Sequence, residues 1–151
     1  MPVATVAATV LATWFGAGKS PLAPGTVGSV ATLPLHLLLR RLGPGAYALT
    51  TLGLYAVGVW AAQREAERLE VSDPSSVVID EVVGTLLALG LAGGGWVRGA
   101  LALGLFRVLD IKKPGLIGRA EHAQPEGVGI MLDDVLAGAL AGAAVRLLTR
   151  R

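Results

Sequence analysis

The chain has 151 residues and a formal net charge of +2; 53% of its residues are hydrophobic, 5% are aromatic, 16% are charged and none is cysteine. This length suits one ordinary domain. The lack of cysteine excludes disulfides, thiolate zinc sites and phosphatases with a cysteine nucleophile, and the small charge with few aromatics argues against nucleic-acid binding. Since soluble domains carry roughly 25% charged residues, the composition indicates a membrane partner or deeply buried helices.

A helical period dominates the apolar residues, and Ala, Leu and Gly outnumber the β-branched and aromatic residues typical of strands. We therefore predict an all-α fold, a single compact, bundle-like domain over residues 1–151 with about six helices. They are expected at 3–13, 26–41 with a bend at Pro34, 46–70, 75–92, 96–112 and 132–149, with a short helix at 115–121. The apolar N-terminus has no basic residue ahead of it, so we expect it to stay in the mature protein.

The sequence is marginal for several membrane spans. Among its uncharged stretches only Leu42–Gln63 clearly reaches the ~20 residues that cross a bilayer, and Pro44 near its start shortens the usable helix. Glycines recur inside the predicted helices although each costs roughly 1 kcal/mol relative to alanine. Close helix–helix contact compensates for this cost, and Gly138 and Gly142 have the spacing that allows it in membranes and in soluble bundles. The polar stretch Gln63–Ser76 is predicted to be solvated.

The carboxylates carry the functional argument. Five lie in apolar segments, where an ionised side chain is costly to bury: Asp80, Glu81, Asp110, Asp133 and Asp134. They predict a shared cation site, and oxygen ligands without cysteine favour Mg²⁺ or Mn²⁺ over zinc. The other six acids lie in polar or loop-like surroundings where a solvated role suffices: Glu65, Glu67, Glu70, Asp73, Glu121 and Glu126.

Structural roles are the alternative for each of these five acids. Buried carboxylates often pair with Arg or Lys, and Arg107 lies three residues before Asp110 on the same helical face. Asp133 could instead cap the helix predicted to begin beside it. Pairing explains one acid more easily than all five together, so the cation site is the preferred interpretation.

A glycine-rich segment, Gly16–Ser29, has the composition of a phosphate cradle. It combines glycines with Lys19, Ser20, Thr26 and Ser29, and a helix is predicted to start near Thr26. The Walker spacing is not met, and a turn that joins two helices with capping hydroxyls is an equal alternative.

A second cationic segment follows Asp110. Lys113 precedes Pro114, which should end a helix, so this lysine either compensates the helix dipole or binds phosphate. We interpret His36 as a packed side chain and His122 as a solvated one, and assign neither to the site.

Four blocks resemble the phosphatidylglycerophosphatase A family and occur in its order. They are Lys19–Ser29, Ile79–Gly84, Phe106–Pro114 and Gly127–Gly138. The resemblance implies a multihelical enzyme of the cytoplasmic side of the bacterial inner membrane that hydrolyses phosphatidylglycerophosphate to phosphatidylglycerol and phosphate with Mg²⁺. Its acidic positions fall on the same five carboxylates, and Lys113 matches its regular cation. One departure is Gln124–Gly127, where the family commonly has a Gly-Gly pair.

The predicted mechanism follows from these residues. The five acids hold one or two Mg²⁺ ions, one carboxylate orients or deprotonates a water, and phosphate is gripped by Lys19, Ser20, Thr26, Ser29, Arg107 and Lys113. The alternatives are a small membrane protein that binds or transports ions, a helical interaction module whose acids pair with Arg and Lys, and a soluble or peripheral phosphomonoesterase of the same fold. The glycine-rich helix faces suggest a homodimer.

Overall fold

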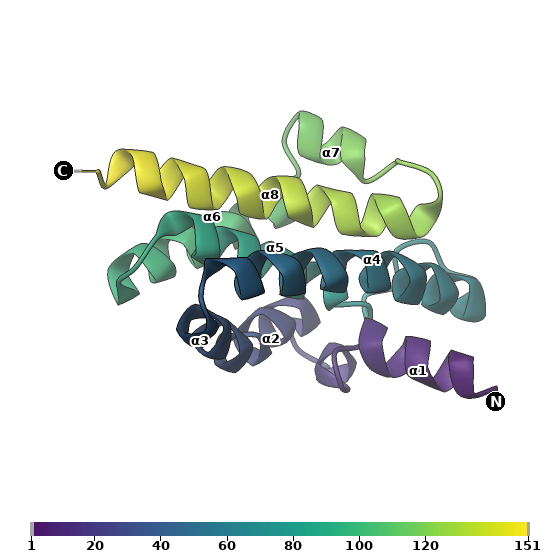
Figure 1. The fold of residues 1–151 in the computed structure, drawn as a ribbon. Helices are drawn as coiled ribbons and strands as arrows, with labels where there is room; N and C mark the ends of the chain where they lie inside the picture. The colour runs from purple at the N-terminus through teal and green to yellow at the C-terminus, as the bar shows by residue number, and fades with distance from the viewer. Residues whose placement is uncertain (1, 151) are drawn as a thin grey trace.

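The computed structural model describes residues 2–150, and within them it contains helices and no strand. The α-helices are α1 (Val3–Ala12), α2 (Pro24–Ala31), α3 (Leu33–Leu42), α4 (Pro44–Leu69), α5 (Ile79–Ala92), α6 (Trp96–Lys112), α7 (Leu116–Ala120) and α8 (Glu126–Leu148), with a short 3₁₀ helix, η1, at Ala17–Lys19 (Figure 1). The all-α prediction is confirmed.

Helix α8 lies at the centre and contacts α4, α5, α6 and α7. Its closest neighbour is α5, because glycines remove the side chains between the two backbones. A Cβ at Gly138 would lie 2.3 Å from the carbonyl oxygen of Gly84, and one at Gly142 would lie 2.6 Å from that of Ala88. The glycine pair of α8 is therefore used inside the chain, which leaves the homodimer prediction without this support.

Two apolar clusters flank the α5–α8 pair. One joins α1 and α4 to the first half of both helices and includes Ala62, Ile79 and Met131. The other joins α6 and α7 to their second half and includes Phe106 and Ala141. The two clusters hold α5 and α8 from opposite sides and fix the side chains between them.

Three helix boundaries differ clearly from the prediction, and the first is the start of α5, at Ile79 instead of residue 75. Residues 26–41 form two helices, with a break at Thr32 rather than a bend, because Pro34 fits only the first turn of a helix. Helix α8 begins at Glu126 instead of residue 132. Gly127 and Gly129 lie inside it because their missing side chains let α8 approach the carbonyl oxygens of Val59 and Glu121.

The prediction of a solvated Gln63–Ser76 stretch is wrong for Glu65 and Ala66, which are buried, whereas the predicted helix end at residue 70 agrees with the end of α4 at Leu69. Glu65 is only 2% exposed. Its carboxylate accepts a hydrogen bond of 2.7 Å from the Thr9 hydroxyl and two from the Arg68 guanidinium, at 2.6 and 2.9 Å. Glu65 thus ties α1 to α4.

Among residues 2–150, two helices are long and apolar enough to cross a membrane by length and composition, α4 and α8. In the apolar window of α8, 56% of the residues are buried inside the chain, as expected for a central helix, whereas the value for α4 is 22%. The outer side of α4 is apolar, with Leu49 74% and Leu52 67% exposed. This face is a candidate for contact with lipid.

Candidate active site

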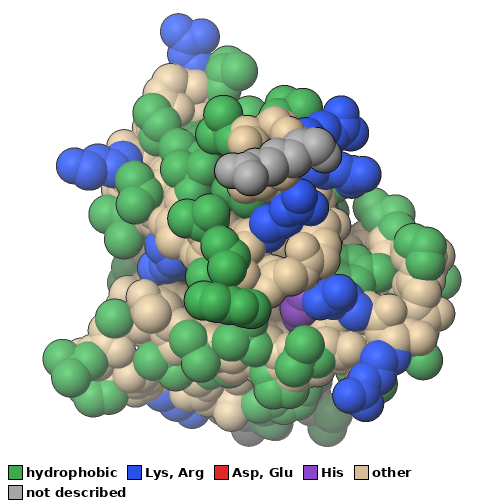
Figure 2. All heavy atoms as spheres, turned by 90° about the vertical axis from the view of Figure 1, so that its left-hand side faces the viewer, with side chains coloured by type: hydrophobic (Ala, Val, Ile, Leu, Met, Phe, Trp, Pro, Cys, Tyr) green, Lys and Arg blue, Asp and Glu red, His purple; other side chains and the backbone are tan. Residues whose placement is uncertain are grey.

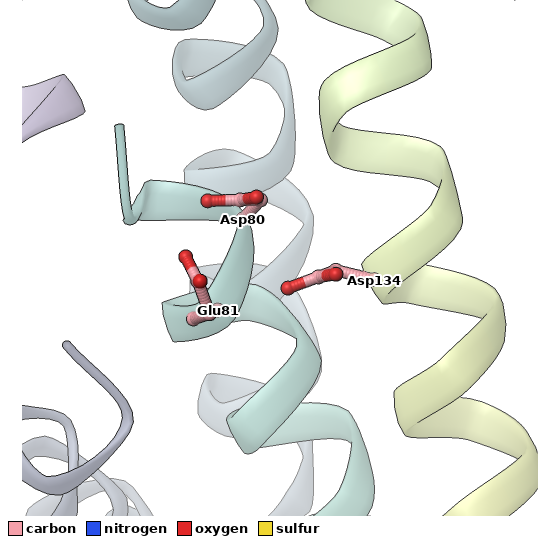
Figure 3. A group of neighbouring side chains, drawn as sticks. All are labelled: Asp80, Glu81 and Asp134. Carbon is pink, nitrogen blue, oxygen red and sulfur yellow. The ribbon is translucent and has the colours of Figure 1, made fainter. Parts of the chain in front are cut away.

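The five carboxylates come together from three helices. Asp80 and Glu81 lie in the first turn of α5, Asp110 lies near the end of α6, and Asp133 and Asp134 lie in the middle of α8. Figure 3 shows Asp134 extending from α8 toward Asp80 and Glu81 at the start of α5. Because α8 begins at Glu126, Asp133 is an interior residue and the interpretation of Asp133 as a helix cap is wrong.

The cluster consists of two overlapping triads that share Asp134. Asp80, Glu81 and Asp134 form one triad, and Asp110, Asp133 and Asp134 form the other. In each triad one oxygen per residue lies within 4.8 Å of the others. Either group of oxygens is compact enough to surround a hard cation.

Several of these oxygens are buried without a hydrogen-bond donor. Asp134 is 0% exposed, and neither of its carboxylate oxygens has a side-chain or backbone partner among the described residues. The same holds for Asp80 Oδ1 and Glu81 Oε2. Buried polar atoms almost always find a partner, so these oxygens fit a cation that is bound between α5 and α8.

Burial and mutual repulsion shift the titration of the cluster. Burial, with the carboxylates of Glu81 and Asp134, raises the pKa of Asp80 well above its usual value. Burial, with Asp110 and Glu81, does the same to the pKa of Asp134. Burial, with repulsion from Asp110, also raises the pKa of Glu81. Burial raises the pKa of Asp133 to about 6, although its hydrogen bond with Lys113 opposes the shift. The cluster is short of positive charge.

Two cations contact the cluster from its edge. The Arg107 guanidinium donates a hydrogen bond to Asp110 Oδ2 and lies 3.5 Å from Glu81 Oε1. Lys113 Nζ donates to Asp133 Oδ2 at 2.6 Å and to Glu121 Oε1 at 3.0 Å. The pairing of Arg107 with Asp110 is therefore present. Against five carboxylates these two charges leave three negative charges if all five ionise, so pairing alone does not neutralise the cluster.

The start of α2 closes the site on the side of Glu81. A Cβ at Gly25 would lie 2.1 Å from Glu81 Oε1 and 2.8 Å from a terminal nitrogen of Arg107. With the Glu81 and Arg107 side chains in these positions there is no room for a Cβ at Gly25. The first amide groups of a helix have no partner within it and attract anions, so the first turn of α2 and Arg107 present donors beside the carboxylates.

The structure separates the predicted phosphate-binding residues into two groups. Thr26 is exposed beside Gly25, and Ser29 lies one turn further on, 1% exposed, with its hydroxyl unpartnered. Lys19 is exposed, contacts none of the five carboxylates in the described part of the chain, and helps Arg68 and Thr9 to hold the pKa of Glu65 below its usual value. Ser20 donates to its neighbour Leu22.

Sequence reasoning missed three residues of the site. Gly25 was one glycine among several, although its position at a predicted helix start singled it out. Glu121 was read as solvated, but it holds Lys113 in place beside Asp133. Thr85 lies one helical turn after Glu81, is 0% exposed and leaves its hydroxyl unpartnered. A hydroxyl in an apolar helix next to buried acids is the signal that points to it.

Fold and site together define an all-helical protein with a buried, oxygen-rich carboxylate centre next to the open end of a helix. The chain belongs to the phosphatidylglycerophosphatase A family, whose model matches residues 10–149, and it is a phosphatase. No solved structure matches the chain.

Three relatives are similar over most of their length. The phosphatidylglycerophosphatase A of Escherichia coli K12 is 37% identical over 134 residues, which cover 87% of this chain and 77% of that protein. The Haemophilus influenzae protein of the same name is 37% identical over 85% of this chain and 80% of its own length. A putative phosphatidylinositol-3-phosphatase of Bacteroides thetaiotaomicron is 39% identical, with 85% of both chains covered.

Proposed function

We propose that this phosphatase removes the phosphate of phosphatidylglycerophosphate in a reaction that depends on Mg²⁺. The observation that carries the metal dependence is Asp134, a fully buried carboxylate without a donor on either oxygen, shared by two triads of acids. Two of the three relatives carry the name phosphatidylglycerophosphatase A, which supports the substrate.

The donor set fits Mg²⁺ because every candidate ligand is a carboxylate oxygen and several of these oxygens lack another partner. Asp80, Glu81, Asp110, Asp133 and Asp134 would hold the metal. When bound, Mg²⁺ supplies positive charge that stabilises the phosphate in the transition state.

The protein's own groups account for the remaining steps. Arg107 and the free amides of the first turn of α2 hold the phosphate oxygens opposite the carboxylates. A carboxylate of the cluster takes a proton from a water as the water oxygen forms a bond to phosphorus. The bond from phosphorus to the glycerol oxygen breaks, and the same carboxyl group returns the proton to that oxygen. Lys113 keeps Asp133 ionised and in place.

Membrane association follows from the substrate and from the surface. The phosphate of a phospholipid lies at the membrane surface, and the exposed apolar side of α4 is suited to contact lipid. We assign the enzyme to the cytoplasmic membrane of a bacterium, with the active site on the cytoplasmic side. Lys19 lies at the exposed edge of the glycine-rich segment, where it is free to meet an anionic lipid surface.

Phosphate release from phosphatidylglycerophosphate in detergent, with and without Mg²⁺, tests this function. The wild-type protein is compared with Asp80→Asn and Asp134→Asn, and Glu67→Gln, an exposed acid of α4, is the matched control. We expect release that needs Mg²⁺, falls at least a hundredfold in both site variants and persists in the control.

The choice of substrates separates the alternatives. Phosphatidylinositol 3-phosphate is assayed in parallel because of the Bacteroides relative, and a water-soluble phosphomonoester because of the soluble alternative. Preferential hydrolysis of either one would reject phosphatidylglycerophosphate as the substrate, and the assignment of the active site would still hold. Mg²⁺ binding without release from any of the three would favour the transport alternative.

A further inference from the structure

A cavity of about 660 Å³ lies between α4 and α5 and reaches from the end of α3 to Val135 of α8. Its size is that of a typical ligand pocket, which is mostly apolar with a few polar groups. Leu52, Leu87 and Val135 form part of its wall. Gly90 keeps it open, because a Cβ there would meet the Tyr47 ring at 2.9 Å.

Three polar groups in the wall are paired within the chain. The Tyr47 hydroxyl donates to the carbonyl oxygen of Leu86 at 2.8 Å and lies 2.8 Å from His36 Nδ1. The Thr51 hydroxyl donates to the carbonyl oxygen of Tyr47. The Tyr47 and Thr51 hydroxyls are therefore engaged within the chain. Most of the other lining residues are apolar, so a hydrocarbon chain suits the interior.

The mouth of the cavity is basic. Arg40 is its one charged lining residue, and its guanidinium lies close to Gly94, where an added Cβ would be 3.3 Å away. Arg98 approaches the adjacent Gly93 in the same way. Within residues 2–150 neither arginine forms an ion pair, and Arg98 donates one hydrogen bond, of 2.8 Å, to the carbonyl oxygen of Thr149. Figure 2 shows this end of the molecule with several Lys and Arg side chains among hydrophobic ones and no Asp or Glu in view.

We propose that this cavity binds one acyl chain of an anionic phospholipid of the surrounding membrane, with the lipid phosphate at Arg40 and Arg98. The charge at the mouth and the mostly apolar wall select an anionic head group on a hydrocarbon chain. The bound lipid would hold the enzyme on anionic membranes whether or not substrate is present.

This lipid is not the one that is hydrolysed. The acids lie in the first turn of α5 and the mouth lies beyond its last turn, and a helix of 14 residues is about 21 Å long at 1.5 Å per residue. A phosphate held by Arg40 is therefore about one helix length away from Asp80 and Glu81. The site stands independently of the proposed substrate.

Binding of a fluorescent phosphatidylserine, labelled with nitrobenzoxadiazole at the end of one acyl chain, tests the site in detergent micelles without Mg²⁺. This lipid is not a phosphomonoester, so the phosphatase does not consume it. The matching phosphatidylcholine has the same chains and a zwitterionic head group. We expect phosphatidylserine to bind at least tenfold more tightly than phosphatidylcholine.

Two pairs of variants separate head-group binding from chain binding. Arg40→Glu should weaken phosphatidylserine binding at least tenfold, whereas Arg41→Glu, its exposed neighbour outside the cavity, should change it less than twofold. Ala48→Trp, at an exposed position in the cavity wall, should block both probes, and Ala56→Trp, exposed on α4 outside the wall, should not. Circular dichroism verifies that all four variants fold.

The results also decide between this lipid and the substrate. Unchanged phosphatidylserine binding in Asp134→Asn supports a separate site, and full displacement of the probe by phosphatidylglycerophosphate together with loss of binding in Asp134→Asn would overturn it. Equal binding of the two probes, or equal loss in Arg40→Glu and Arg41→Glu, would also overturn the proposal.

Discussion

Lys113 Nζ lies 2.6 Å from Asp133 Oδ2 and thereby joins the end of α6 to the middle of α8. Lys113→Met removes this charge and leaves a buried carboxylate without its donor, at a cost of about 1–3 kcal/mol in the free energy of unfolding. We expect kcat to fall at least tenfold because Asp133 is no longer held toward Asp134. Steady-state phosphate release and urea unfolding measure the two effects.

The neighbouring lysine provides the control for this experiment. Lys112 is exposed and forms no ion pair in the described residues, so Lys112→Met should leave both quantities nearly unchanged. Lys113→Arg keeps the charge and should recover part of the activity. Full activity in Lys113→Met would show that Asp133 does not depend on this contact.

Gly138 is the tightest point of contact between the two central helices. The Cβ of Gly138→Ala would lie 2.3 Å from the carbonyl oxygen of Gly84, so α5 and α8 must move apart, at a cost of about 1–3 kcal/mol. Activity should fall as well, because the two helices carry Asp80 and Asp134. Gly104→Ala in α6 meets nothing within 4 Å and should instead stabilise by about 0.5–1 kcal/mol. Equal effects in urea unfolding would contradict this assignment.

Much of the site could be predicted from the sequence because burying a charge costs much free energy, and an acid among apolar residues is recognisable from its neighbours in sequence. Asp80 and Asp134 sit among apolar neighbours, and that conflict is visible without a fold. Glu65 escaped the same argument because its surroundings in sequence are polar, whereas its burial depends on Thr9, 56 residues away. The residues next to Glu65 in the sequence do not indicate a partner so far along the chain.

The start of α8 illustrates the opposite error. Gly127 and Gly129 were predicted to lie in a loop because glycine weakens a helix. Both lie inside α8, because the close approach of Val59 and Glu121 leaves no room for a side chain there. Tertiary contact decided the boundary. For the same reason the approach of Gly25 to Glu81 could not be predicted, since α2 and α5 are far apart in the sequence.

Glu65 predicts how stability changes with pH. The hydrogen bond from Arg68, with that from Thr9, holds the pKa of Glu65 below its usual value. A lowered carboxyl pKa contributes stability that is present above the unfolded value of about 4.3 and is lost as the pH falls below it. Glu65→Gln should therefore lower the free energy of unfolding by about 1–3 kcal/mol at pH 7 and flatten its decline between pH 5 and 3.

The control for this pH effect lies half a turn away on the same helix. Glu67 is exposed, pairs with Arg64 at 3.6 Å and accepts a solvent-exposed hydrogen bond from Gln63 on the same helix. Glu67→Gln should leave the pH profile from urea unfolding close to that of the wild type. If Glu65→Gln behaved in the same way, the carboxylate of Glu65 would not be what ties α1 to α4.

Asp134→Asn should change stability in opposite directions with and without metal. In the metal-free protein at pH 8 the amide replaces an unpartnered carboxylate with a donor toward its acidic neighbours, so the free energy of unfolding should rise by about 1 kcal/mol. With Mg²⁺ the wild type should gain about 2.7 kcal/mol at a concentration of 100 times Kd, and the variant should gain little. Thermal unfolding with and without Mg²⁺ measures both. If Asp134 served only in packing, Asp134→Asn would lower the free energy of unfolding both with and without Mg²⁺. That result would exclude Asp134 from the metal site.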